Sequence, residues 1–150
     1  MHIELATLCD AKPILALQKL AYIEEAILYN DFAIPPLVQK IEQVIQEFNE
    51  KLVLKVSIDG KIIGSVRASQ DNGSCYIGKL IVHPTYQNRG IGTRLLNEIE
   101  KNFQHCKRYE LFTGCNSSKN IYLYQKNGYM LFKELQISDK LKLVYLQKEQ

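Results

Sequence analysis

The stretch of sequence that decides the fold reads Leu80-Ile81-Val82-His83-Pro84-Thr85-Tyr86-Gln87-Asn88-Arg89-Gly90-Ile91-Gly92-Thr93-Arg94-Leu95-Leu96. Its apolar beginning is typical of a short strand, which must end at Pro84 because proline has no N–H to donate. After a polar turn, two glycines precede apolar residues at helical spacing. The predicted helix runs over 91–103, with its apolar stripe formed by Ile91, Leu95, Leu96, Ile99 and Phe103.

A strand followed by a helix that opens with glycines is suited to bind phosphate. The first turn of a helix has unpaired N–H groups and a partial positive charge. Gly90 and Gly92 carry no side chain that would block these donors, and Arg89 adds a full charge. No lysine follows the second glycine and residue 95 is leucine, which excludes a Walker loop and the dinucleotide fingerprint. A turn without any ligand also explains a bare Gly-x-Gly pair.

Length and composition indicate one soluble globular domain over residues 1–150, with 46% hydrophobic and 23% charged residues. The net charge of +3 is mild and the basic residues are scattered, so we expect no nucleic-acid partner. No apolar run is long enough for a bilayer, and no secretory signal is visible at the start. The spacing of Cys9, Cys75, Cys106 and Cys115 indicates reduced thiols in a cytoplasmic protein, with no metal site.

Periodicity and turn residues predict a mixed α/β (α+β) fold, with a mostly antiparallel twisted sheet flanked by helices on both faces. Asp59-Gly60 marks a tight hairpin, and Gly128 marks a helix end that needs a left-handed residue. The predicted strands are 2–6, 52–58, 61–68, 76–82, 109–113, 129–135 and 140–146. The predicted helices are 11–29, 37–48, 91–103 and 117–127.

Two segments of the chain resemble signatures of the GNAT N-acyltransferase superfamily. Residues 87–92 match its Gln/Arg-x-x-Gly-x-Gly/Ala loop, and residues 120–129 match its closing Leu-Tyr and Gly-Phe/Tyr signature. The element order agrees as well, so the resemblance covers essentially the whole chain. It implies that loop amides hold the pyrophosphate of acetyl-CoA (coenzyme A) and that the preceding strand pairs with the pantetheine arm. The implied cofactor-binding residues are Leu80, Ile81, Val82, Gln87, Asn88, Arg89, Gly90, Ile91, Gly92, Thr93, Ser117, Asn120 and Tyr124. Ser117 is a departure, because many relatives carry a second asparagine there.

The resemblance also implies catalytic roles. Tyr124 matches the tyrosine that protonates the departing CoA sulfur. Without the signature, an aromatic residue of the core would explain the same position equally well. Glu110 is the acidic residue on the strand after the glycine loop, and is our candidate for the general base. Glu24 and Glu25 on the first helix are rivals for that role. Tyr22, Glu25 and Tyr29 are the candidate substrate-binding residues.

These observations predict an acetyl-CoA-dependent N-acetyltransferase that moves an acetyl group to a primary amine of a small molecule by direct attack. Two alternatives stay open: a protein or peptide N-acetyltransferase, and a non-catalytic sensor that binds acyl-CoA. The sequence leaves the amine unidentified, and homodimers are frequent among similar proteins.

Overall fold

A seven-stranded sheet runs through the molecule in the order β1-β2-β3-β4-β5-β7-β6. The computed structural model describes all residues from Met1 to Gln150. Every neighbouring pair of strands is antiparallel except β4 and β5, which are parallel. The strands are β1 His2–Leu5, β2 Leu52–Ile58, β3 Lys61–Asp71, β4 Ser74–Val82, β5 Arg108–Gly114, β6 Met130–Gln136 and β7 Lys142–Glu149. The predicted mixed and mostly antiparallel sheet is confirmed.

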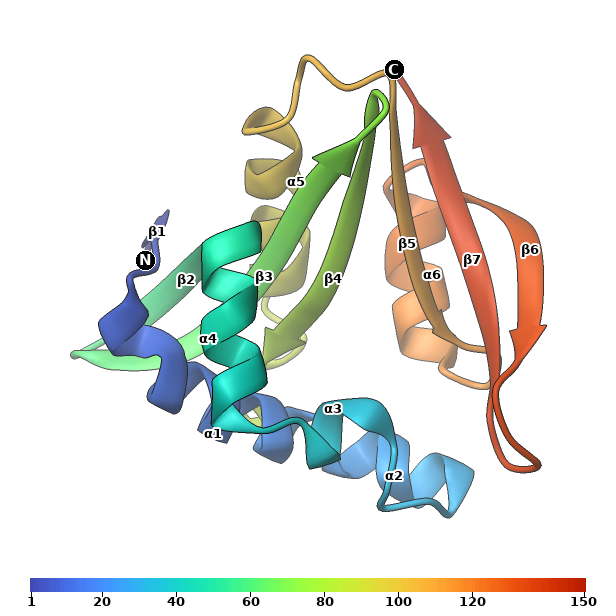
Figure 1. Cartoon of the computed structure of the whole chain (residues 1–150), viewed down its shortest axis with the longest axis horizontal. Coiled ribbons are helices and arrows are strands. Elements are labelled where there is room, and N and C mark those ends of the chain that lie inside the picture. The colour runs from blue at the N-terminus through green and yellow to red at the C-terminus, as the bar shows by residue number, and fades with distance from the viewer.

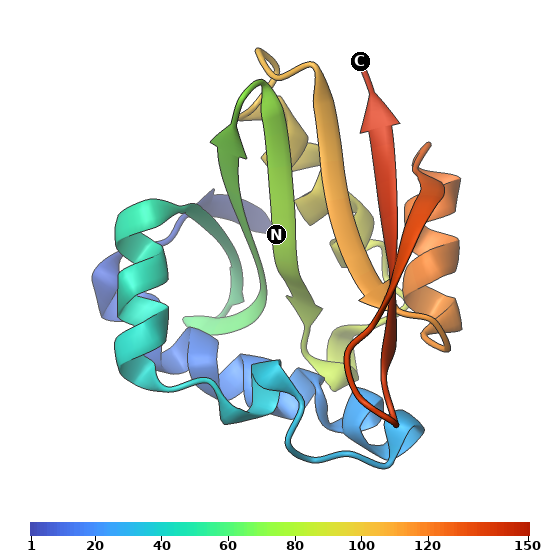
Figure 2. The same ribbon diagram turned by 45° about the vertical axis from the view of Figure 1, so that its right-hand side comes forward.

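Helices cover both faces of this sheet, as predicted. α1 and α4 lie on one face, and α5 and α6 lie on the other (Figures 1 and 2). None of them combines the length and the apolar character needed to cross a membrane. The helices are α1 Ala11–Ala21, α2 Ile23–Tyr29, α3 Pro35–Val38, α4 Ile41–Glu50, α5 Ile91–Lys101 and α6 Ser118–Lys126, with 3-10 turns η1 Leu8–Asp10 and η2 Pro84–Tyr86.

The first helical region differs from the prediction of one helix over 11–29. The helix is interrupted at Tyr22, whose backbone adopts a turn conformation with φ −87° and ψ 1°. The break lets α1 pack on the sheet while α2 continues toward the turn between β6 and β7 (Figure 1). No glycine or proline stands at this position, so no local signal predicts the break. The predicted helix 37–48 is likewise divided, because Gln39 is extended between α3 and α4.

The apolar stripe predicted for the glycine-opened helix is confirmed for four of its five residues; Phe103 lies beyond the end of α5 at Lys101, although it is buried in the same core. Ile91, Leu95, Leu96 and Ile99 are at most 2% exposed and belong to the main core with β2, β3 and β4. Burial of such a side chain contributes roughly 1.5–3 kcal/mol. This packing anchors α5 on the sheet and therefore sets the position of its first turn.

Two predicted turns also have the expected backbone conformations. Asp59 and Gly60 have φ of 50° and 78°, as a tight hairpin between β2 and β3 requires. Gly128 has φ of 96° after α6, which is the left-handed stop expected there. All four cysteines are free thiols.

Candidate active site

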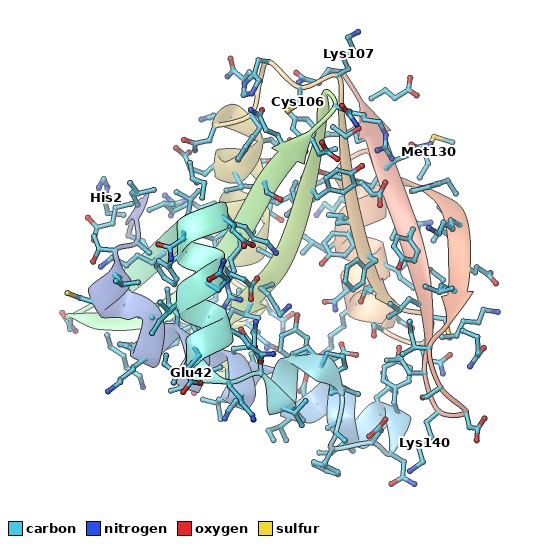
Figure 3. The ribbon with its side chains drawn as sticks, viewed as in Figure 1. His2, Glu42, Cys106, Lys107, Met130 and Lys140 are labelled. Atoms are coloured by element: carbon cyan, nitrogen blue, oxygen red, sulfur yellow. The ribbon has the colours of Figure 1, made fainter.

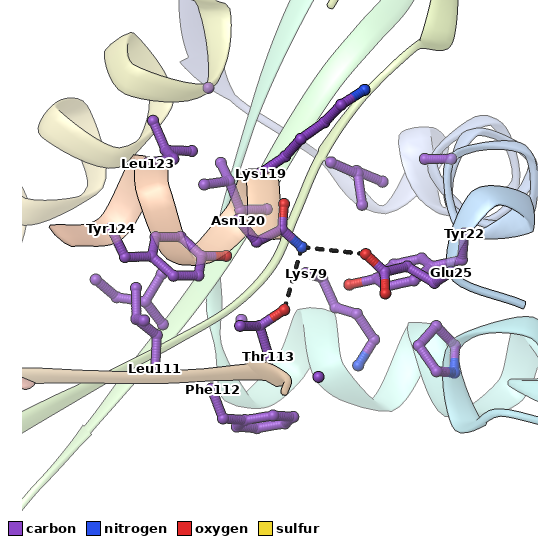
Figure 4. Close-up of a pocket in the computed structure, with 18 of the residues that line it drawn as sticks. Tyr22, Glu25, Lys79, Leu111, Phe112, Thr113, Lys119, Asn120, Leu123 and Tyr124 are labelled. Atoms are coloured by element: carbon purple, nitrogen blue, oxygen red, sulfur yellow. Dashed lines mark hydrogen bonds between the residues drawn. The ribbon is translucent and has the colours of Figure 1, made fainter. Parts of the chain in front are cut away.

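A cavity of about 730 Å³ lies where strands β4 and β5 separate. The two strands pair only between residues 74–76 and residues 108–110. Beyond Tyr76 the edge of β4 that faces β5 has no strand partner, so its N–H and C=O groups are free to pair with a ligand. Figure 4 shows the side chains that enter this cavity from β4, β5, α6 and the first helices.

Strand β4 contains a bulge beside the cavity. Ser65 pairs with Ile81 and Arg67 pairs with Gly78, so two residues of β4, Lys79 and Leu80, oppose one residue of β3. Lys79 has a left-handed φ of 50°, which is unusual for a residue with a side chain. The bulge lies beyond Tyr76, the last residue of β4 that pairs with β5, and the Lys79 side chain extends into the cavity (Figure 4).

The first turn of α5 offers unpaired backbone donors. Gly90 precedes the helix with φ of 80°, and the first helical bond runs from the amide of Arg94 to the Gly90 carbonyl at 3.1 Å. The amides of Ile91, Gly92 and Thr93 therefore have no partner in the protein. The Gln87 side chain donates to the Val82 carbonyl at 3.1 Å and so braces the loop.

Most of the predicted phosphate loop reaches the cavity, and a few of its side chains do not. Gln87, Asn88, Gly90, Gly92 and Thr93 line the cavity, together with Leu80, Ile81 and Val82. The Arg89 guanidinium instead lies over the Tyr86 ring at 5.2 Å, and the Ile91 side chain is buried in the core.

Tyr124 on α6 presents an unpaired hydroxyl to the cavity. The residue is 6% exposed, lines the cavity and makes no side-chain hydrogen bond within the protein. Burial, with smaller contributions from the charges of Tyr22 and Glu25, raises the pKa of Tyr124 far above its usual value. The hydroxyl therefore remains protonated at neutral pH and can act as a hydrogen-bond donor.

Glu24 and Glu25 on α2 both line the cavity; Glu24 is exposed, whereas Glu25 is half-buried and held by hydrogen bonds. The two Glu25 oxygens accept from Ser117 Oγ at 2.6 Å and from Asn120 Nδ2 at 3.3 Å. Figure 4 shows the bond from Asn120. Asn120 Nδ2 also donates to Thr113 Oγ1 at 3.1 Å. Burial raises the pKa of Glu25, the bond from Ser117 lowers it in part, and the charge of Glu24 raises it again. A carboxylate with a raised pKa is a better proton acceptor than an ordinary one.

Tyr29 completes a chain of hydrogen bonds behind Glu25. Its hydroxyl lies 2.8 Å from Ser117 Oγ and accepts from the Asn116 amide at 2.8 Å. Because the single Ser117 proton goes to Glu25, Tyr29 must donate to Ser117. A Cβ on Gly114 would lie 2.0 Å from the Tyr29 hydroxyl, so only glycine allows this approach.

Besides Arg89 and Ile91, two more of the predicted residues do not reach the cavity wall. Glu110 is absent from the cavity lining, and its Oε1 accepts from Arg108 Nη2 at 2.8 Å. Ser117 is 4% exposed and also absent from the lining, since its hydroxyl points to Glu25. Thr113 and Lys79 line the cavity without having been predicted. Only pairing between strands reveals the bulge at Lys79, so no local pattern could have identified it.

An apolar cluster lies beside the cavity, at α2, and contributes three residues to its lining. Ala26 and Tyr29 of α2 pack with Ile34 and with Leu141, which follows β6. The turn that carries Lys140 therefore lies against α2 (Figure 3). Tyr22 and Tyr29, the predicted walls of an acceptor pocket, both line the cavity here.

Comparison with known proteins identifies relatives of the chain. It is 30% identical over 119 residues to the UPF0157 protein YqkA of Bacillus subtilis, a match that covers 79% of this chain and 34% of YqkA. It is 36% identical over 76 residues to the uncharacterized protein YdhI of the same organism, covering 49% of this chain and 46% of YdhI. The chain thus matches less than half the length of either relative.

Solved structures share the fold over the whole chain. The ribosomal-protein-alanine N-acetyltransferase of Brucella melitensis superposes with a TM-score of 0.79 at 19% identity, covering 100% of both chains. PaiA N-acetyltransferase of Thermoplasma acidophilum, solved in complex with coenzyme A, gives 0.75 at 18% identity over 100% of both chains. YncA of Salmonella typhimurium, solved with acetyl-CoA, gives 0.78 at 17% identity over 99% of this chain and 93% of its own.

A family model decides the assignment. The model of the acetyltransferase (GNAT) family matches residues 17–129, which include both signatures and the whole strand β4. Its cosubstrate, acetyl-CoA, agrees with the ligands of the similar structures. The chain belongs to the acetyltransferase (GNAT) family, a family of acyltransferases that use acetyl-CoA.

Proposed function

We propose that this chain is an acetyl-CoA-dependent N-acetyltransferase whose acceptor is a primary amine of a small molecule. One observation carries the proposal: unpaired amides, an unpaired tyrosine hydroxyl and a half-buried carboxylate all meet in the cavity between β4 and β5. The amides suit a diphosphate, the hydroxyl suits a thiolate, and the carboxylate suits an ammonium group.

The residues present fit the cosubstrate. The free amides of residues 91–93 would hold the diphosphate, with Gln87, Asn88, Arg89 and Gly90 shaping the loop. The unpaired edge of β4 at residues 80–82 would hydrogen-bond the amides of the pantetheine arm, as another strand would. Acetyl-CoA supplies an acetyl group that is already activated as a thioester.

Proton handling falls to Glu25 and Tyr124. An amine is nucleophilic only when neutral, and the Glu25 carboxylate, oriented by Ser117 and Asn120, would accept its proton. Tyr124 would donate to the departing sulfur, since its hydroxyl is protonated and has no other partner. Each such proton transfer contributes about 10²- to 10⁴-fold in rate. Glu110 is less suited to act as the base, because Arg108 holds it away from the cavity.

The contact between α2 and the segment after β6 favours a small acceptor over a peptide. The apolar cluster of Ala26, Tyr29, Ile34 and Leu141 joins α2 to the segment after β6. A long peptide would need this contact to open, whereas a small amine can enter the cavity as it is. A protein or peptide acceptor is therefore the alternative that the substrate assay has to exclude.

Tyr124→Phe tests the proposal. We expect at least a tenfold fall in kcat for CoA release with an accepted amine, and an unchanged affinity for coenzyme A by calorimetry. Polyamines, aminoglycosides, amino acids and peptides form the acceptor panel. A wild-type protein that binds coenzyme A and releases no thiol with any of them would instead be a sensor, and the proposed activity would be wrong.

A further inference from the structure

Lys79 is a cation in the cavity that has no counter-ion. Its side chain makes no ion pair and no hydrogen bond, although it is half-buried and extends from the β4 bulge into the cavity (Figure 4). A left-handed backbone at a lysine is strained, and such strain persists where the surrounding structure imposes it, often at binding sites. Burial lowers the pKa of Lys79, which reflects the cost of this unpaired charge.

The neighbouring charges do not neutralise Lys79. The charged neighbours of Lys79 are Glu47, Lys51 and Arg67, of which only Glu47 is acidic. Its oxygens accept from Lys51 at 3.0 Å and from Arg67 at 3.2 Å. Gln39 donates to the same carboxylate. Arg67 is itself 1% exposed, and its Nε has no hydrogen-bond partner. Lys51, Arg67 and Lys79 all line the cavity, and the Glu47 carboxylate that contacts Lys51 and Arg67 is the single negative charge of this group of four residues.

The positive group formed by Lys51, Arg67 and Lys79 lies away from the proposed diphosphate site at the start of α5. We call the part of the cavity beside this group and Glu25 the acceptor side. Glu47 belongs to α4, which covers the face of the sheet opposite to α5 (Figure 1). Figure 4 shows the Lys79 side chain directed toward α4, while Glu25 enters the same cavity from α2. The cavity thus offers a cation and a carboxylate to whatever occupies its acceptor side.

We propose that the acceptor is a zwitterionic amine, whose ammonium group lies at Glu25 and whose carboxylate or phosphate binds Lys79. This inference rests on the proposed function and specifies its substrate class. An anion would supply the counter-ion that Lys79 lacks, and the positive group would hold it in a partly dehydrated site. A second ammonium group, as in a diamine, would be repelled by Lys79, Lys51 and Arg67.

Matched acceptors test this charge preference. γ-Aminobutyrate is compared with butylamine and putrescine, β-alanine with propylamine, ε-aminocaproate with hexylamine, and phosphoethanolamine with ethylamine. In the wild type we expect kcat/KM to be at least about 10-fold higher for the anionic member of one pair or more. The pair with the largest ratio also shows whether carboxylate or phosphate is preferred. A ratio near unity in every pair, or a preference for putrescine over γ-aminobutyrate, would overturn the inference.

Variants of Lys79 assign the preference to this side chain. Lys79→Met should bring the ratio close to unity by slowing only the anionic acceptor, and should leave the KM for acetyl-CoA unchanged. Lys79→Arg keeps the charge and should retain most of the ratio. Lys61→Met removes one charge from an exposed position in the adjacent hairpin and is the matched control. An unchanged ratio in Lys79→Met, or a raised KM for acetyl-CoA, would contradict the assignment.

Binding measurements separate this inference from the proposed activity. If alkylamines and their anionic analogues are acetylated equally well, the zwitterion inference fails and the transferase function stands. If no amine releases thiol, the transferase function fails. Calorimetric titration of γ-aminobutyrate and butylamine into the protein with coenzyme A then decides the charge preference, because it needs no turnover.

Discussion

Gly114, at the end of β5, is the position where one added methyl group should disturb both stability and chemistry. In Gly114→Ala the new Cβ would lie 2.0 Å from the Tyr29 hydroxyl oxygen and 2.4 Å from the ring carbon that carries it. An ordinary contact begins near 3.4 Å, so the ring would have to retreat by about 1.4 Å. Tyr29 is 6% exposed and packs with Ala26, Ile34 and Leu141, which leaves it little room.

Three contributions set the expected loss of stability. Overpacking of a buried site costs about 1–3 kcal/mol. Displacement of the Tyr29 hydroxyl removes its bonds to Ser117 and to the Asn116 amide, at about 1 kcal/mol each. The lower chain entropy of alanine in the unfolded state returns about 0.4–1 kcal/mol. We therefore expect the free energy of unfolding to fall by about 3 kcal/mol.

Chemical denaturation and thiol release measure the two consequences of Gly114→Ala. Besides the loss of stability, kcat should fall about 10- to 100-fold. The displaced Tyr29 no longer holds the Ser117 hydroxyl, and Ser117 then no longer orients Glu25. Gly78→Ala is the control for stability, since a Cβ there meets nothing within 4 Å. In a Tyr29→Ala background the added methyl group should cost little. If the effects of Gly114→Ala and Tyr29→Ala on stability simply add, the proposed steric conflict does not exist.

Three further substitutions test the assignment of the charged groups. Glu25→Gln should lower kcat about 10²-fold or more and remove the acidic limb of the pH–rate profile. That limb should lie above the pH at which an ordinary glutamate titrates, because burial raises the pKa of Glu25. Glu110→Gln should change kcat less than threefold if the same reasoning holds, and equal losses in both variants would contradict it.

Glu47→Gln leaves Arg67 buried without its counter-ion and should cost about 3 kcal/mol in unfolding free energy. Burial by itself would raise the pKa of Glu47, but Arg67, together with Lys51, outweighs it and holds the pKa below its usual value. The stability from this group is therefore present above about pH 4.5, the usual value, and is lost as pH falls through the lowered pKa. Denaturation curves across acidic pH should show that loss in the wild type and not in Glu47→Gln.

Local patterns predicted the elements that have strong local signals. The glycine-opened helix, its buried stripe and the hairpin at Asp59-Gly60 depend on residues close together in the chain. The interruption at Tyr22 was missed because its cause is tertiary: α1 packs on the sheet, whereas α2 reaches Leu141. The alternation along β5 placed Glu110 on a strand, but which face meets the cavity depends on the neighbouring strands.

The sequence alone determined the family resemblance, the mixed sheet and the donors at the start of α5, because each depends on short-range spacing and backbone chemistry. Only the tertiary structure decided which charges share the cavity. Glu25 meets Ser117 from 92 positions away, and Lys79 enters because a bulge in β4 re-aims the chain. Such contacts follow from strand register and helix packing, which no local pattern encodes.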